Sequence, residues 1–201
     1  MIEINPLDQT ERDNYKLMIG SIIPRPIAFV TTKSKEGIVN GAPFSYFNVV
    51  SSNPPLISVS IQHKDKQSKD TARNIFDTKE FVVHIVDSEN VEDVNQTAAN
   101  LEYNHSEIDL TNFTLIDSSR IDVPGIKQSK IRMECILEET LINRDNDYHF
   151  DLIIGKIVSF HIDESIYEEG KINPMKLDPI SRLAGNSYAK IGEIFDLERP
   201  E

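Results

Sequence analysis

The chain has 201 residues, of which 39% are hydrophobic and 27% are charged, a profile typical of a globular protein with enough apolar material for one core. Its formal net charge of −12 opposes binding to nucleic acid phosphates and to anionic membranes, so an anionic ligand would need a local cluster of cations. The single cysteine, Cys135, excludes an intramolecular disulfide. The start of the chain has no secretory pattern and no apolar stretch reaches about 20 residues, so we expect a cytoplasmic protein with a single domain over residues 1–201.

The chain predicts strands in hairpin-like pairs with a few short helices between them. Alternation is clearest in PLISVSIQ, where Ile57, Val59 and Ile61 share one face. Strands are expected at residues 26–32, 38–50 (bent at Gly41–Pro43), 55–62, 80–86, 130–142 and 148–162. Helices are expected at residues 68–76, with Ser68 as N-cap, and at 88–98. This order favours an antiparallel barrel or sandwich with peripheral helices over a parallel doubly wound sheet.

The sequence lacks the motifs of several common kinds of active site. The sequence has no G-x-G-x-x-G, no Walker loop and no G-x-S-x-G. Its five histidines are scattered without metal-ligand spacing, so we expect no metal site. Cys135 lies on the apolar face of an expected strand together with Ile131, Met133 and Leu137, which indicates a core thiol and not a nucleophile.

Residues 41–56, GAPFSYFNVVSSNPPL, break the alternation expected of a half-buried strand. Aromatic side chains are interleaved with hydroxyl and amide groups, and prolines stand at both ends. Such a mixture suits the wall of a pocket for a flat heteroaromatic ligand, which needs both apolar contact and hydrogen bonds around its rim.

Residues 64–74, KDKQSKDTARN, are locally cationic in an acidic chain and stand where a helix is expected to begin. Free backbone N–H groups and the helix dipole make such a place suitable for a phosphate. A solvated basic helix start is the alternative interpretation. A third segment, RLAGNSYA at residues 182–189, is either a surface loop or a loop that closes over a ligand.

Taken together, six segments resemble the flavin reductase-like family of FMN-binding split barrels, and its flavoredoxin branch in particular. They are IPRPIAFVTT, G.VN.APFSYFN.VSSNPPL, KDTARNI, EFVVHIV, DYHFDLIIGKIV and RLAG..YA..G, and they follow in order from about residue 15 to residue 195. The resemblance implies a mainly β fold, an antiparallel Greek-key split β-barrel with peripheral helices. It also implies non-covalent FMN, a homodimer with the flavin near the subunit interface, and NAD(P)H as a transient co-substrate.

The resemblance also implies which residues contact the flavin. The ring and ribityl chain would be contacted by residues after the first hairpin and by the end of the preceding strand, and the phosphate by the basic segment. The first set is Thr31, Thr32, Ser45, Tyr46, Phe47, Asn48 and Ser51, and the second is Lys69, Asp70, Thr71 and Asn74. Arg182, Gly185 and Tyr188 match the family's C-terminal loop and would reach the ring or the dimer partner.

Two further residues have open alternatives. Arg25, between two prolines, is either a ligand contact or part of a structural ion pair. His149 resembles the family's histidine near the flavin, where an imidazole could stabilise reduced flavin or donate a proton; the alternative is a satisfied histidine on a strand.

We therefore expect an FMN-dependent oxidoreductase that passes electrons to free flavin, a metal complex or a disulfide. The alternative is a non-catalytic FMN protein that carries electrons or stores flavin. A nucleic-acid-binding barrel is a third class, which the net charge of −12 opposes.

Overall fold

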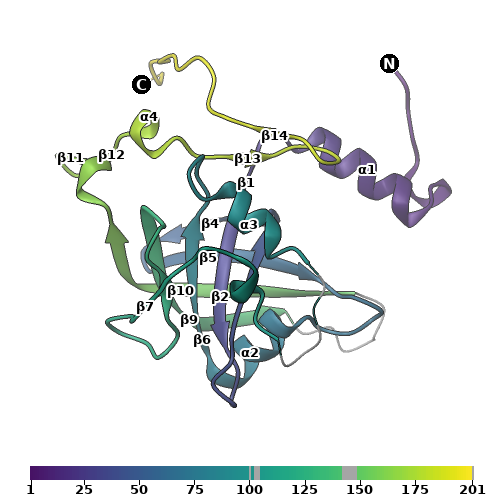
Figure 1. The fold of residues 1–201 in the computed structure, drawn as a ribbon. Coiled ribbons are helices and arrows are strands. Elements are labelled where there is room, and N and C mark those ends of the chain that lie inside the picture. The colour runs from purple at the N-terminus through teal and green to yellow at the C-terminus, as the bar shows by residue number, and fades with distance from the viewer. Residues whose placement is uncertain (100, 102–104, 142–148, 201) are drawn as a thin grey trace.

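A computed structural model describes residues 1–99, 101, 105–141 and 149–200 of the chain. Its main element is one seven-stranded sheet in which every neighbouring pair is antiparallel (Figure 1). In spatial order the strands are β3 (Val39–Phe44), β2 (Ala28–Lys33), β6 (Glu80–Ile85), β9 (Ile131–Leu141), β10 (Phe150–Ile162), β5 (Pro55–Gln62) and β4 (Phe47–Ser52). The expected mainly β, antiparallel architecture is confirmed, and the sheet is left open between β3 and β4.

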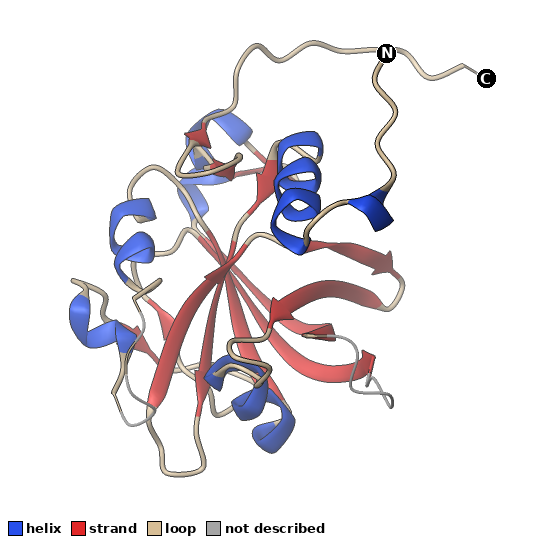
Figure 2. Cartoon of the chain, turned by 90° about the vertical axis from the view of Figure 1, so that its right-hand side faces the viewer, coloured by secondary structure: helices blue, strands red, loops and turns tan. Residues whose placement is uncertain are grey.

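Short elements surround this sheet, and Figure 2 shows the strands fanning out in one twisted layer with helices outside it. The helices are α1 (Glu11–Ser21), α2 (Asp70–Thr78), α3 (Val91–Gln96) and α4 (Pro174–Leu177), with 3-10 turns η1 (Pro6–Asp8), η2 (Glu107–Leu110) and η3 (Glu164–Ile166). The remaining strands are β1 (Arg25–Pro26), β7 (Leu115–Ile116), β8 (Gly125–Ile126), β11 (Tyr167–Glu168), β12 (Lys171–Ile172), β13 (Ser181–Arg182) and β14 (Tyr188–Ala189). No helix in the described part of the chain is long and apolar enough to cross a membrane.

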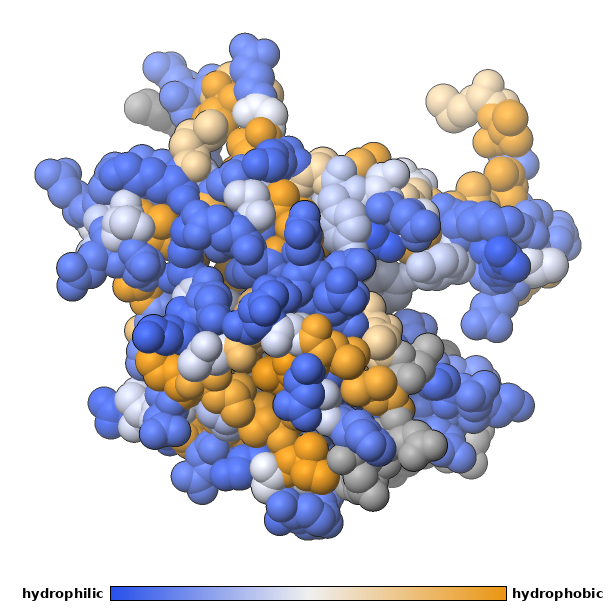
Figure 3. All heavy atoms as spheres, viewed as in Figure 1, coloured by the Kyte–Doolittle hydropathy of each residue, from blue (hydrophilic) through white to orange (hydrophobic). Residues whose placement is uncertain are grey.

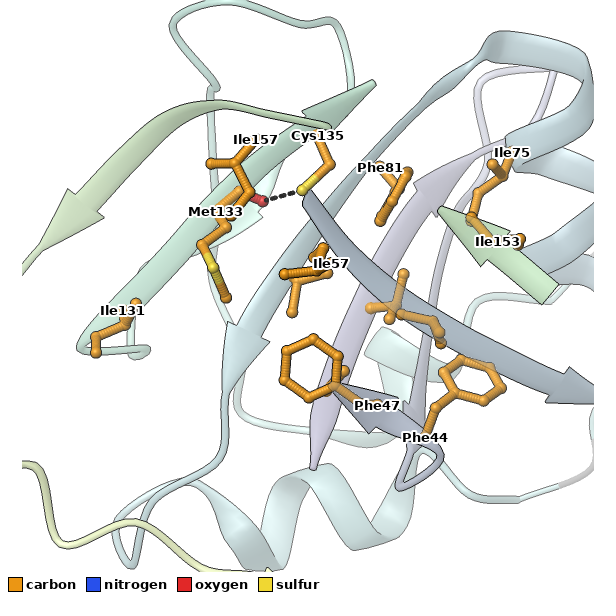
Figure 4. Close-up of a cluster of buried hydrophobic side chains, with 14 of the residues drawn as sticks. Phe44, Phe47, Ile57, Ile75, Phe81, Ile131, Met133, Cys135, Ile153 and Ile157 are labelled. Carbon is orange, nitrogen blue, oxygen red and sulfur yellow. Dashed lines mark hydrogen bonds between the residues drawn. The ribbon is translucent and has the colours of Figure 1, made fainter. Parts of the chain in front are cut away.

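The main core lies on the concave side of the sheet and is formed by the alternate side chains of the strands that point to this side. Ile57, Val59 and Ile61 of β5 are buried as expected, and so are Met133 and Cys135 of β9. Figure 4 shows Phe44 and Phe47 pointing into this cluster from β3 and β4. The Cys135 thiol donates to the Met133 carbonyl at 3.4 Å, and burial raises its pKa, which confirms an inert core thiol.

Three sequence expectations are corrected. The strand expected over residues 38–50 is divided at Ser45 and Tyr46, where the chain bends from β3 to β4. The helix expected from Ser68 begins at Asp70, with Lys69 at the N-cap position. The Pro- and Gly-bearing segment at residues 173–192, which its sequence predicts to be a loop and not a core element, contributes Leu177 of α4 to the core. The polar residues 144–147, RDND, predict a turn between the last two long strands, and they lie outside the described residues.

A fully buried histidine joins two strands to the loop before β9. His84 of β6 is 0% exposed; its Nδ1–H donates to the Phe29 carbonyl at 2.9 Å, and its Nε2 accepts from the Ile126 N–H at 2.9 Å. The Ile126 N–H must meet a lone pair, so this pair of bonds fixes the neutral Nδ1–H tautomer. Burial lowers the pKa of His84 to about 3, since a buried imidazolium would lack solvation.

This depressed pKa predicts an acid-sensitive fold. Between the folded-state pKa and the unfolded value of 6.5, the unfolded chain binds more protons at this position, so stability falls as pH falls through that window. The His84 contribution alone should lower the free energy of unfolding by about 2 kcal/mol between pH 7 and pH 5. Urea denaturation at both pH values checks this.

The His84→Gln variant should be less stable at pH 7, because two backbone groups lose their partner, but should lack this part of the acid loss. The exposed His105 offers a matched control, and His105→Gln should keep the wild-type pH dependence. Equal pH dependence in His84→Gln and wild type would contradict the assignment.

Candidate functional site

The first candidate site is a pocket of about 480 Å³ beside the open edge at β3. We call it the flavin pocket, for the ligand that the sequence predicts. Its wall comes from the end of β3, the loop at residues 64–69, the start of α2, residues 97–99 with Leu101, and η2. The volume lies within the usual range of small-molecule sites. Five segments that are distant in sequence therefore meet around one cavity.

The start of α2 offers unpaired backbone donors to this pocket. Thr71 and Ala72 are buried, which anchors the first turn against the sheet, and Asp70 and Thr71 line the cavity. Lys69 at the N-cap makes no side-chain capping bond. The first N–H groups of a helix have no partner within the helix, so an uncapped start fits an anion such as a phosphate.

A cation and an aromatic ring lie next to this helix start. The Lys69 Nζ lies 5.9 Å from the centroid of the Phe44 ring, and both residues line the pocket. Partial burial and the neighbouring Lys64 ammonium lower the pKa of Lys69, although the residue remains exposed overall. Arg73 is paired with Asp70 and donates to the Ser68 carbonyl at 2.8 Å. Lys69 thus supplies a positive charge that no carboxylate of the described residues pairs with.

A buried polar network forms the floor behind the pocket. The Asn40 amide donates to the Glu107 carboxylate at 2.6 Å, and its oxygen accepts from the Thr71 hydroxyl at 3.0 Å. Asn74 donates to the Thr32 hydroxyl at 3.0 Å, beside Asn40. Burial raises the pKa of Glu107. The network fixes α2 and η2 to the edge of the sheet, and it accounts for Thr32 and Asn74, two predicted contacts that lie in this layer and do not line the pocket.

The predicted contacts after the first hairpin lie on a different part of the surface. Ser45 and Tyr46 form the half-buried bend, and Phe47 is in the core. Asn48 and Ser51 lie on the edge strand β4, where the Asn48 Oδ1 accepts from the Val49 N–H at 2.8 Å and the Ser51 Oγ from the Asn53 N–H at 3.2 Å. None of the five lines the flavin pocket of the single chain, and their contact with flavin stays a prediction.

The C-terminal residues form a third group at the β13–β14 hairpin. The Arg182 guanidinium carbon lies 4.5 Å from the Tyr188 ring centroid, and the guanidinium donates to the Gly185 carbonyl. Gly185 has a φ of +61°, a left-handed conformation that favours glycine. The Tyr188 hydroxyl donates to the Asn95 Oδ1 at 3.0 Å. The loop is therefore held in one shape by its own side chains.

Arg25 and Thr31, two of the predicted flavin contacts, are hydrogen-bonded to backbone carbonyls. The buried Arg25 guanidinium donates to the carbonyls of Ile19, Ile22 and Leu183 at 2.6–2.9 Å, and so ties the end of α1 to the C-terminal hairpin. No carboxylate among the described residues pairs with it, so its observed partners are backbone carbonyls and not an ion-pair partner, and its contact with a ligand stays a prediction. The buried Thr31 hydroxyl donates to the Pro124 carbonyl at 2.7 Å.

His149 is exposed and immediately precedes β10. Its carbonyl accepts from the His63 N–H at 2.8 Å, and the two imidazole rings are 6.5 Å apart. The His63 Nε2 lies 3.0 Å from the Asp151 carboxylate. His63 is next in sequence to Lys64, which lines the flavin pocket, whereas neither His63 nor His149 lines it. A catalytic role for His149 stays a prediction.

Most of the pocket lining was not singled out from the sequence, and three of these residues bear on its chemistry, namely Asn40, Phe44 and Glu107. Asn40 stands within a strand, where asparagine is disfavoured, and this was an available signal. Phe44 was assigned to the general pocket wall without a specific role. Glu107 gave no local signal, since only the fold brings η2 to β3.

Comparison with known proteins agrees with this geometry. A model of the flavin reductase like domain matches residues 19–177. Nitrilotriacetate monooxygenase component B from Bacillus cereus is 56% identical, with a TM-score of 0.95 over 98% of both chains. The 2-nitrobenzoate 2-nitroreductase NbaA of Pseudomonas fluorescens is 31% identical, with a TM-score of 0.87 over 99% of this chain and 96% of that one.

The flavoredoxin of Desulfovibrio vulgaris (Miyazaki F) shares the fold at 21% identity, with a TM-score of 0.76 over 88% of this chain and 91% of that one. The resemblance inferred from the six segments is confirmed. The chain therefore belongs to the flavin reductase-like domain family, which supports a flavin cofactor and an oxidoreductase activity.

Proposed function

We propose that the chain is an FMN-dependent reductase that oxidises NADH or NADPH and passes the electrons to a second acceptor. The observation that supports this most directly is the flavin pocket, where an uncapped helix start and the Lys69 ammonium meet beside the Phe44 ring. A phosphate attached to a flat ring system matches both halves of that arrangement. When bound, FMN supplies the ability to accept a hydride and release electrons.

The chain's own residues would bind and orient the cofactor. The backbone N–H groups at the start of α2 and the Lys69 ammonium would hold the phosphate, and Phe44 would give an apolar surface. Asp70 faces the same cavity, but its carboxylate is paired with Arg73, which reduces its repulsion of an anion. The buried Asn40–Glu107–Thr71 network would keep the helix start in place.

We also propose that two copies form the complete site. The predicted flavin contacts on β4 and on the β13–β14 hairpin lie outside the pocket of a single chain. Strand β1, which pairs with β13, links these two groups of residues. The β4 edge exposes Val49 (73%) and Val50 (50%). The terminal segments expose apolar side chains among polar ones (Figure 3), and the apolar members include Ile194 and Phe195. Exposed apolar groups and an unpaired strand edge favour association with a second copy.

The similarity to nitrilotriacetate monooxygenase component B favours reduced flavin, handed to a separate oxygenase, as the product. The 2-nitroreductase similarity favours a nitroaromatic acceptor as a second candidate. A non-catalytic FMN carrier uses the same binding residues. Steady NAD(P)H oxidation with added free flavin distinguishes a reductase from a carrier, and nitro-group reduction distinguishes the second candidate.

The purified protein should retain FMN, and Lys69→Gln should weaken FMN binding at least about tenfold, because a charge-assisted contact to phosphate is lost. Fluorescence titration of the apoprotein with FMN measures this. The exposed Lys171, far from the pocket lining, provides the control Lys171→Gln, which should bind FMN as the wild type does. Failure of the wild type to bind FMN would overturn the proposed function.

Thr71→Val should lower the free energy of unfolding by about 1 kcal/mol, since the Asn40 oxygen loses its closest donor while the side-chain shape is kept. FMN binding should weaken as the helix start loses its support. Urea denaturation and FMN titration check both effects. The exposed Thr114 gives the control Thr114→Val, for which we expect no change in FMN affinity; an equal loss in both variants would argue against the network.

Val49→Asp should shift the protein from dimer to monomer and weaken FMN retention, because a carboxylate would be buried in the proposed interface. Sedimentation velocity at several concentrations measures the assembly state. Leu115→Asp, at an exposed apolar position elsewhere (43% exposed), should leave the dimer intact. A monomeric wild type that binds FMN fully would contradict the shared site.

A further inference from the structure

A second pocket, of about 400 Å³, lies at the other end of the long strand β10. His63 and Lys64, beside the flavin pocket, neighbour the beginning of β10, whereas this distal pocket is lined by residues 160–163 at its end and by Lys127, Ser129, Lys130 and Arg132. β10 has 13 residues, so its path from one end to the other is roughly 40 Å when fully extended. The two pockets share no lining residue. The distal pocket therefore has no part in the proposed flavin site.

Two cations of the distal pocket are not neutralised by a bonded carboxylate. Arg132 is half-buried, and its guanidinium donates to the Ile126 carbonyl at a long 3.3 Å. The exposed Lys127 side chain has no hydrogen bond or ion pair within the described part of the chain. A guanidinium has five N–H donors in a rigid fork, so Arg132 retains donors that suit an oxyanion.

The other charged groups around the pocket already have partners within the chain. Lys130 is paired with Glu89 at 2.7 Å, and Asp87 and Asp178 also lie near it. The His161 imidazole is paired with the buried Glu134, whose oxygens also accept the Ser119 and Arg120 N–H groups at 2.7 Å.

Asp163 is the one acidic residue among the described residues that line the pocket, and it accepts from the Ser165 N–H at 2.8 Å. The lining carries Lys127, Lys130 and Arg132 against Asp163, while Glu89 is paired with Lys130 and the charge of Glu134 also acts on Arg132. Lys127 and Arg132 remain the two cations of the pocket without a bonded carboxylate among the described residues.

A buried hydroxyl at the same place lacks a partner. Ser129 lines the distal pocket, is only 9% exposed, and its Oγ makes no hydrogen bond to any described residue. A buried hydroxyl without a partner costs free energy and is uncommon in native proteins. A ligand oxygen in the pocket would give it one. Phe160, 54% exposed, adds an aromatic surface at the rim.

We propose that the distal pocket binds the oxyanion group of a small molecule, a phosphate or a carboxylate. Arg132 and Lys127 supply the positive charge, and Ser129 supplies a neutral donor. The two kinds of ligand differ in their contact with Phe160. The ring of a benzoate would contact the Phe160 side chain, whereas inorganic phosphate would not.

The FMN-loaded protein is titrated with inorganic phosphate and, separately, with benzoate, at constant ionic strength set by chloride. Amide chemical shifts of residues 127–132 and 160–163, measured by NMR, should move and saturate with at least one of the two. Saturation with benzoate that weakens in Phe160→Ala would identify an aromatic carboxylate; saturation with phosphate alone would identify a phosphate. Failure of both to give saturable shifts would overturn the proposal.

The variants test which residues bind. Arg132→Gln and Lys127→Gln should each raise the dissociation constant about tenfold, and Ser129→Ala should raise it by a smaller factor. Unchanged amide chemical shifts in the rest of the spectrum show that each variant is folded. If Arg132→Gln folds poorly, the test rests on Lys127→Gln, because the Lys127 side chain is exposed and its replacement should not disturb the fold. Lys171→Gln should bind as the wild type does. Unchanged binding in Lys127→Gln, or equal weakening in the flavin-pocket variant Lys69→Gln, would overturn the proposal.

Discussion

The β9–β10 hairpin is the constraint on which the rest of the molecule depends. β9 pairs with β6 on one side and with β10 on the other, so it joins the two halves of the sheet, β3-β2-β6 and β10-β5-β4. Its inward side chains, among them Met133 and Cys135, form the middle of the core. The register shifts along the pair, at Ile154/Gly155 and at Ile157/Ser159, bend the strands. That bend lets the sheet curve around its own apolar face and leaves β3 and β4 as free edges.

The two candidate sites follow from this geometry. The flavin pocket uses a free edge, where α2 and η2 cover the end of β3 and fix it through buried polar side chains. The distal pocket uses the other end of the hairpin, where β9 begins and β10 ends. The β9–β10 pair thus provides the middle of the core and one polar cavity where β9 begins and β10 ends, whereas the flavin pocket lies at the β3 edge.

Buried polar groups in this fold are used to position loops. His84 connects β2 and β6 to the loop at Ile126. Glu134 holds the Ser119–Arg120 backbone by two charge-assisted bonds, which lower the pKa of its carboxyl despite burial. Arg25 does the same for the end of α1 and the C-terminal hairpin. Each group bonds to at least one backbone atom far away in sequence, which gives a loop one defined place.

The sequence by itself determined the strands, the antiparallel class, the inert Cys135 and the flavin reductase-like family, because alternation and ordered motifs are local properties of the chain. It also predicted a phosphate site at the helix start around Lys69, and this stays a prediction. Tertiary structure alone decided that Asn40, Phe44 and Glu107 complete this pocket, that Thr32 and Asn74 lie behind it, and that Asn48 and Arg182 lie outside it. The physical reason is that a pocket is formed by side chains from segments that meet only after the sheet has curved, and no local pattern specifies those meetings.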